Sequence, residues 1–177
     1  MAKGDVLRAQ GRSEEAIPEY ETVLASNPND AHALHVLADC KLLTGSIEEV
    51  IPLEEQAIRL SPCDPLIGWL YLRIGHEHLL QSRIGEAIRW LERGRRAIPK
   101  LPFVHLLLAS ACALKGETER AAVELAEARR LHGGDRYLSI GHVRAFRGGY
   151  WGAAPKTRAL FDATYLAGLR KAGMPEE

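Results

Sequence analysis

The chain has 177 residues, enough for one compact domain or a short array of repeats. Hydrophobic residues make up 46% and charged residues 26%, which is ordinary for a globular protein. The formal net charge is zero, but residues 1–64 carry five Lys and Arg against twelve Asp and Glu, whereas residues 65–177 carry eighteen against eleven.

Several classes of protein are not expected from this sequence. The longest nearly apolar run, Val104 to Leu114, is too short to span a bilayer, and the N-terminus lacks the apolar core of a signal peptide. The cysteines Cys40, Cys63 and Cys112 form no CxxC pair, so we expect free thiols in a reducing cytoplasm and no structural zinc. The predicted location is cytoplasmic.

Taken in chain order, the predicted elements repeat. Residues 31–64 align without a gap on residues 102–135, and both 34-residue stretches have two helical patterns separated by glycine at the fifteenth place, Gly45 or Gly116. Residues 68–101 fit the same frame after a three-residue insert, and residues 1–30 fit it from the fifth place onward.

Small residues recur at places 8, 20 and 27 of the frame, where they let paired helices approach closely. They are Gly4, Ala16 and Val23; Ala38, Val50 and Ala57; Gly75, Ala87 and Gly94; and Ala109, Ala121 and Ala128. Pro28, Pro62 and Pro99 end the second helix of their units. Val23 and Val50 are larger than the alanine that is usual at these places.

Residues 136–177 follow the repeats. Residues 136–147 are predicted to form a helix, a loop follows at residues 148–152, and Pro155 opens a last helix. The apolar residues of this helix recur at helical spacing: Leu160, Phe161, Thr164, Tyr165 and Leu169. We expect this helix to cap the array.

The 34-residue frame resembles the tetratricopeptide repeat (TPR) over about three quarters of the chain. The resemblance implies an all-α, right-handed α-α superhelix with three full repeats and a partial N-terminal one. The array would cover residues 1–135, with units 1–30, 31–64, 68–101 and 102–135, and residues 136–177 would form C-terminal capping helices. It also implies a cytoplasmic scaffold without cofactor that binds proteins or peptides.

The tail supports a narrower comparison. The stretches SPCDPLIGW, HLLQSRIGEAIRWLER and FDATYLAGLRKAGMPEE resemble the C-terminal TPR region of alphaproteobacterial class III nucleotide cyclases and winged-helix regulators. That resemblance implies an alternative role, a regulatory segment of a bacterial cyclase or transcriptional regulator that senses a ligand or partner. It lends this chain no catalytic residue.

The motif GHEHLL at residues 75–80 suggests a metal site but fits the repeat frame better. Residues two apart on a helix point about 200° apart, so His76 and His78 cannot hold one metal from one face. Gly75 occupies a small-residue place, and His78 falls where an aromatic side chain packs between helices. We therefore expect no metal site here.

In TPR proteins a concave groove lined by the first helices holds the ligand. The corresponding places predict a partner-binding groove here, formed by His32, His35, Asp39, Trp69, Leu72, His76, Phe103, Leu106 and Ser110. Its histidines are either a pH-sensitive, anion- or metal-binding patch or merely polar surface, with Asp39 paired to His35. Trp69 and Phe103 either anchor a ligand or pack against the next helix. The Asn and Lys clamp of chaperone-binding members is absent.

Catalysis and nucleic-acid binding are not expected. No HExxH, GxSxG, phosphate-loop or dinucleotide motif is present, so the chain is predicted not to be an enzyme. The stripe of Arg89, Arg93 and Arg96 lacks interleaved aromatic residues and is interrupted by Glu86 and Glu92, which favours a solvated outer face.

The N-terminal unit is short and apolar at its edge, with Val6, Leu7, Ala16 and Ile17. An array normally needs a polar cover at each end. We therefore expect an upstream domain or a second copy to cover this edge, and the opposite charges of the two halves favour a homodimer through the N-terminal half.

Overall fold

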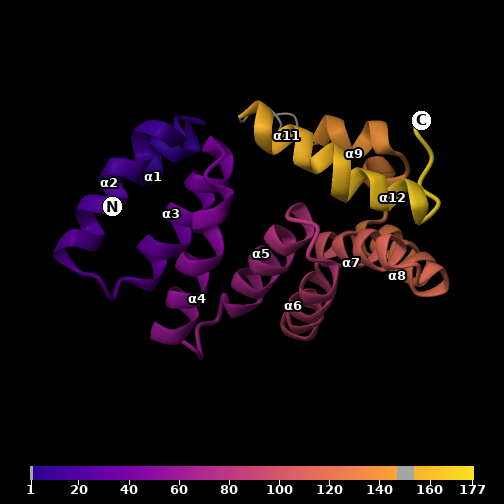
Figure 1. Cartoon of the computed structure of the whole chain (residues 1–177), viewed down its shortest axis with the longest axis horizontal. Helices are drawn as coiled ribbons and strands as arrows, with labels where there is room; N and C mark the ends of the chain where they lie inside the picture. Colours follow the sequence, from indigo (N-terminus) through magenta and orange to yellow (C-terminus); the bar gives the residue numbers. More distant parts are fainter. Residues whose placement is uncertain (1, 147–153) are drawn as a thin grey trace.

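The structure, a computed structural model, describes residues 2–146 and 154–177, and the described residues form helices without strands. Helices α1 to α8 pack successively against their chain neighbours (Figure 1). Their bounds are α1 Ala2–Ala9, α2 Ser13–Ser26, α3 Ala31–Thr44, α4 Val50–Leu60, α5 Ile67–Leu80, α6 Ile84–Ala97, α7 Pro102–Lys115 and α8 Thr118–His132, with a 3₁₀ turn η1 at Ile47–Glu49. This confirms the predicted all-α fold of stacked helices.

The repeated glycines act as the frame requires. Gly45 and Gly116 end α3 and α7 at φ values of 93° and 89°, a left-handed conformation that costs a residue without Cβ little. A Cβ on Gly75 would lie 2.6 Å from Cγ of Leu91, so α5 and α6 approach as closely as they do only because this place is glycine. The packing explanation of GHEHLL therefore holds at its first residue.

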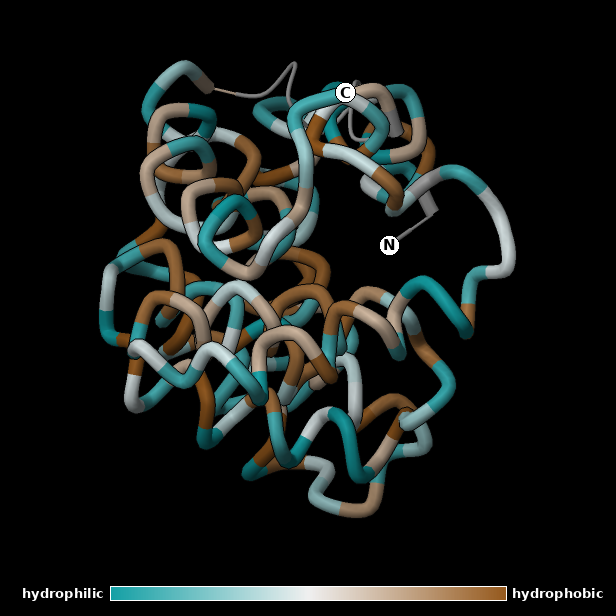
Figure 2. The backbone as a smooth tube through the Cα atoms, turned by 90° about the vertical axis from the view of Figure 1, so that its right-hand side faces the viewer, coloured by the Kyte–Doolittle hydropathy of each residue, from teal (hydrophilic) through white to brown (hydrophobic). Residues whose placement is uncertain are grey.

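Alternate helices of the array form one continuous inner layer. Residues 155–171, near the C-terminus, contact α3, α5 and α7, while α4 packs on α3, α6 on α5 and α8 on α7 (Figure 1). We call the surface of α3, α5 and α7 that faces this segment the concave face. Hydrophobic residues gather between the layers and hydrophilic residues on the outer turns (Figure 2). No helix within residues 2–146 or 154–177 has both the length and the apolar character needed to cross a bilayer.

The C-terminal segment turns back along the array. It comprises a 3₁₀ turn η2 (Asp135–Tyr137), α9 (Ile140–Phe146), α11 (Pro155–Phe161), a π-helical turn η3 (Asp162–Leu166) and α12 (Ala167–Lys171). The last three are continuous, and we call residues 155–171 the C-terminal helix. Backbone amides of Ile140 and Gly141 donate to the carbonyls of Pro175 and Glu176, which ties the chain end to α9.

The last helix begins at Pro155, as predicted. It packs on α7, a helix of the last unit, and also on α5 and α3, because its apolar stripe matches the inner layer. The turn η2 packs against α8, the last helix of the array. The predicted loop at residues 148–152 lies outside the described residues.

Candidate functional site: the concave face

Four rings from three elements meet at the centre of the concave face. His76 of α5 lies with its ring centroid 5.0 Å from that of Phe161 and 5.8 Å from that of Phe103, both edge-on. Tyr165 completes the group, 6.2 Å from Phe103 and 6.1 Å from Phe161. Edge-to-face pairs at such distances add about 1 kcal/mol each beyond the apolar area they bury. This aromatic cluster joins the C-terminal helix to α5 and α7.

Next to the rings, the backbones of two helices meet. The Ser110 hydroxyl donates a hydrogen bond of 2.8 Å to the carbonyl of Tyr165, and both residues are buried. That carbonyl lies in the π-helical turn, where the backbone departs from regular α-helical bonding. A Cβ on Gly168 would lie 2.5 Å from the Ser110 carbonyl oxygen and still closer to its hydroxyl, so only glycine fits at this contact.

The first turn of the C-terminal helix is held by α3. The Thr157 hydroxyl donates to the carbonyl of Leu42 at 3.0 Å, and the amide of Ala154 donates to the carbonyl of Leu43 at 3.1 Å. Lys156 forms an exposed ion pair of 3.1 Å with Glu48. The C-terminal helix therefore spans the concave face from the second unit to the fourth.

The sequence-predicted groove residues divide into two groups. We call His76, Phe103 and Ser110 the closed end, because the C-terminal helix contacts them; Leu72 and Leu106 lie buried in the same core cluster as Phe161 and Tyr165. We call His32, His35, Asp39 and Trp69 the open end. Here His32 is exposed, and Trp69 keeps 41% of its surface exposed.

Charged groups dominate the open end. His35 Nδ1 lies 2.8 and 3.0 Å from the two carboxylate oxygens of the fully buried Glu54 on α4. Burial alone would lower the pKa of His35, but the hydrogen bond and charge of Glu54 raise it above its ordinary value. Asp39 pairs with Arg73 of α5 and lies 3.9 Å from Arg8 of α1. One of the two interpretations of the sequence paired Asp39 with His35, but in the structure the two side chains have different partners.

Beneath the open end lies a buried carboxyl group. Glu77 is fully buried, and neither carboxyl oxygen has a hydrogen-bond partner among the described residues. Burial raises its pKa to about 8, with Glu54 and Asp39 adding to the effect and Arg73 opposing it. Glu77 therefore keeps its proton to a higher pH than an exposed glutamate does.

Two histidines of the predicted patch take part in separate contacts. His76 belongs to the aromatic cluster and His35 to the Glu54 pair. In residues 2–146 and 154–177, no three His, Cys, Asp or Glu side chains are arranged to hold a metal ion. His78 is buried as expected, and burial lowers its pKa to about 4.

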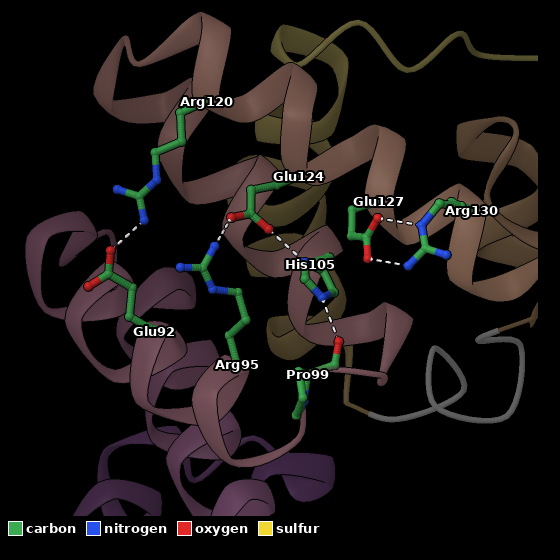
Figure 3. Close-up of polar contacts among 8 residues, drawn as sticks. All are labelled: Glu92, Arg95, Pro99, His105, Arg120, Glu124, Glu127 and Arg130. Carbon is green, nitrogen blue, oxygen red and sulfur yellow. Dashed lines mark hydrogen bonds and ion pairs between the residues drawn. The ribbon is translucent and has the colours of Figure 1, made fainter.

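A polar network on the outer side of α6, α7 and α8 escaped the sequence reasoning (Figure 3). The buried Glu124 accepts from Arg95 at 2.5 Å and from His105 Nδ1 at 2.7 Å, while His105 Nε2 lies 3.0 Å from the carbonyl of Pro99. Both ring nitrogens face oxygen atoms, an arrangement that favours the doubly protonated ring of His105. A spacing in the sequence could have predicted this network. Three pairs in contact are each separated by nineteen residues: His35 and Glu54, Tyr71 and Trp90, and His105 and Glu124.

The arginine stripe also has partners on this outer side. Arg89 pairs with Glu86, and Arg93 lies 4.6 Å from the ring centroid of Trp90. The adjacent Arg95 belongs to the Glu124 network. Two of the three stripe residues, Arg89 and Arg93, therefore have contacts within α6.

Comparison with known proteins agrees with this architecture. A family model described as tetratricopeptide repeat matches residues 1–65. The units at 68–101 and 102–135, which the sequence frame aligned, lie outside that match. A search of the curated proteins found no match.

Solved structures of TPR proteins share the fold over nearly the whole chain. A crystal structure of MamA superposes with a TM-score of 0.69 at 20% identity and covers 98% of each chain. YrrB, described as a TPR protein with an unusual peptide-binding site, superposes at 0.66 with 15% identity, covering 97% of this chain and 85% of its own. TTC0263, a thermophilic TPR protein of Thermus thermophilus, superposes at 0.58 with 22% identity, covering 96% and 97%. At these identities the likeness establishes the fold alone.

Proposed function

We propose that this chain is a non-catalytic scaffold that binds a protein or peptide on its concave face. The surface comprises the open end (His32, His35, Asp39 and Trp69) and the closed end (His76, Phe103 and Ser110), with Leu72 and Leu106 beneath. The peptide-binding site described for YrrB, which has the same fold, supports this use of the architecture.

One observation carries the proposal. The concave face already holds an amphipathic helix through ring contacts, a backbone-directed hydroxyl and a tight glycine contact. A face that contacts one helical segment in this way has the shape and chemistry to bind another. At the open end, the exposed Trp69 offers the kind of large aromatic side chain that dominates binding energy at interfaces.

A displayed library of peptides tests the proposal. Peptides selected on the wild-type chain should bind Trp69→Ala about 10-fold or more weakly, because an aromatic anchor contributes well over 1 kcal/mol. Trp90→Ala is the matched control, since Trp90 packs against Tyr71 and Arg93 on the outer side. Equal loss of affinity in both variants, or none in either, would contradict the proposed surface.

Two further expectations are kept as proposals. The similarity of the tail to cyclase and winged-helix regulators suggests that partner binding serves regulation in the bacterial cytoplasm, and a full-length transcript carrying such a domain would test it.

Val6 of α1 is 56% exposed, which fits self-association through the N-terminal half. Light scattering at low and high salt tests that second proposal, and a monomer of 19.6 kDa in both would contradict it.

A further inference from the structure

The C-terminal helix makes the contacts that a bound partner would make. It touches all three helices of the concave face, and it buries Phe161 and Tyr165 to 1% exposure. Its residues are separated from α3 by more than one hundred positions in sequence, so these contacts are long-range ones. Any partner helix at the closed end would have to take the same space.

The geometry specifies what this space accepts. Phe161 and Tyr165 are four residues apart and enter the aromatic cluster from one side of the helix. Three residues later, Gly168 lies against Ser110, where no Cβ fits. Leu169 follows on the same buried stripe. The complementary ligand is therefore an amphipathic helix with aromatic residues at i and i+4, glycine at i+7 and an aliphatic residue at i+8.

We propose that the closed end is a docking surface for a partner helix with this pattern, and that the C-terminal helix is an internal occupant which the partner displaces. The inference rests on the proposed function and adds the chemistry of the partner and its regulation. A tethered segment competes at an effective concentration in the millimolar range, so a free helix with the same contacts binds the intact chain weakly. Loosening the internal helix then raises the affinity for the partner.

The test uses the full-length chain and a labelled peptide with the sequence of residues 154–177. In Gly168→Leu the added side chain meets the Ser110 backbone, so the internal helix leaves the closed end. Gly85→Leu is the matched control, because Gly85 is an exposed residue of α6 and a Cβ added there would meet no atom within 4 Å. Fluorescence anisotropy should show the peptide binding Gly168→Leu at least about 10-fold more tightly than wild type or Gly85→Leu.

A second peptide, itself carrying Gly168→Leu, should bind none of the three chains, since it cannot approach Ser110. Equal affinity of the first peptide for Gly168→Leu and wild type, with circular dichroism showing both folded, would overturn the proposal. If Gly168→Leu does not fold, Phe161→Ala/Tyr165→Ala replaces it, because that variant removes anchors without adding volume.

The outcome is separable from that of the proposed function. Library peptides that lose affinity for Trp69→Ala would support the scaffold even if the 154–177 peptide bound wild type and Gly168→Leu equally, and that equality would overturn displacement alone. Failure to select any library peptide would contradict the scaffold, whereas tighter binding of the 154–177 peptide to Gly168→Leu would still support displacement.

Discussion

The two ends of the concave face are built from the same repeat frame but hold their neighbours by different chemistry. At the closed end, place 9 carries His76 or Ser110, and the contacts are rings, a hydroxyl and glycine. At the open end, the same place carries Asp39, and the contacts are ion pairs with arginines. The repeat frame places these side chains on the same face of the array. Their residue types decide whether they contact the C-terminal helix or form ion pairs.

This difference predicts different sensitivities. Apolar contacts respond to loss of side-chain volume, whereas buried ionisable groups respond to pH. Truncation of a ring at the closed end should therefore lower the free energy of unfolding strongly. Protonation of groups at the open end should make that free energy depend on pH.

The largest effect is expected from Phe161→Ala. Phe161 is 1% exposed and packs against His76 and Tyr165, so truncation should lower the free energy of unfolding by about 3–5 kcal/mol. Urea denaturation followed by circular dichroism measures this. A loss below about 1 kcal/mol would show that the C-terminal helix contributes little to the closed end.

Glu77→Gln addresses the region beneath the open end. The folded pKa of Glu77 is raised to about 8, so above its ordinary pKa the unfolded chain releases a proton that the folded chain keeps. Stability from this group is complete in acid and falls as pH rises toward 8, by about 1.4 kcal/mol per unit. Between pH 5 and 7 the free energy of unfolding of wild type should fall by about 3 kcal/mol through this group, and that of Glu77→Gln should not. Parallel stability-versus-pH curves for variant and wild type would contradict the assignment.

Glu124→Gln tests the outer network, which should be independent of both ends. Burial lowers the pKa of His105, but its hydrogen bonds to Glu124 and the Pro99 carbonyl and the Glu124 charge together raise it. Its stabilisation is therefore present below the ordinary histidine pKa and lost as pH rises through the raised value. The substitution should cost about 2 kcal/mol at pH 6 and less at pH 9. Nuclear magnetic resonance titration of His105 provides the check: a pKa in wild type that is not above the ordinary histidine value would contradict the raised pKa.

The smallest effect is expected from Trp69→Ala at the open end. Because 41% of Trp69 remains exposed, its loss should change the free energy of unfolding by about 1 kcal/mol or less. Thermal unfolding beside Phe161→Ala gives the contrast directly. A destabilisation equal to that of Phe161→Ala would show that both ends are packed alike.

The fold was predictable because the small residues of the frame report helix packing. Gly75 and the left-handed Gly45 and Gly116 behave in the structure as their places in the frame imply. The start of the last helix at Pro155 was likewise visible from its apolar spacing.

The partner contacts of the site were not predictable in the same way. Periodicity shows that Phe161 and Tyr165 share an apolar stripe but does not specify which face of the array they meet. Asp39 and His35 are neighbours on one helix, yet Arg73 and Glu54 on other helices take them as partners. Such choices depend on tertiary distances that a single unit does not contain.

Hydrogen exchange of the C-terminal helix tests the central claim most directly. If the helix is docked on the concave face, backbone amides of residues 161–171 should exchange in wild type nearly as slowly as those of residues 106–113 in α7. In Gly168→Leu the first set should become fast while the second stays slow. Fast exchange of residues 161–171 in wild type, with α7 protected, would contradict the occupied concave face.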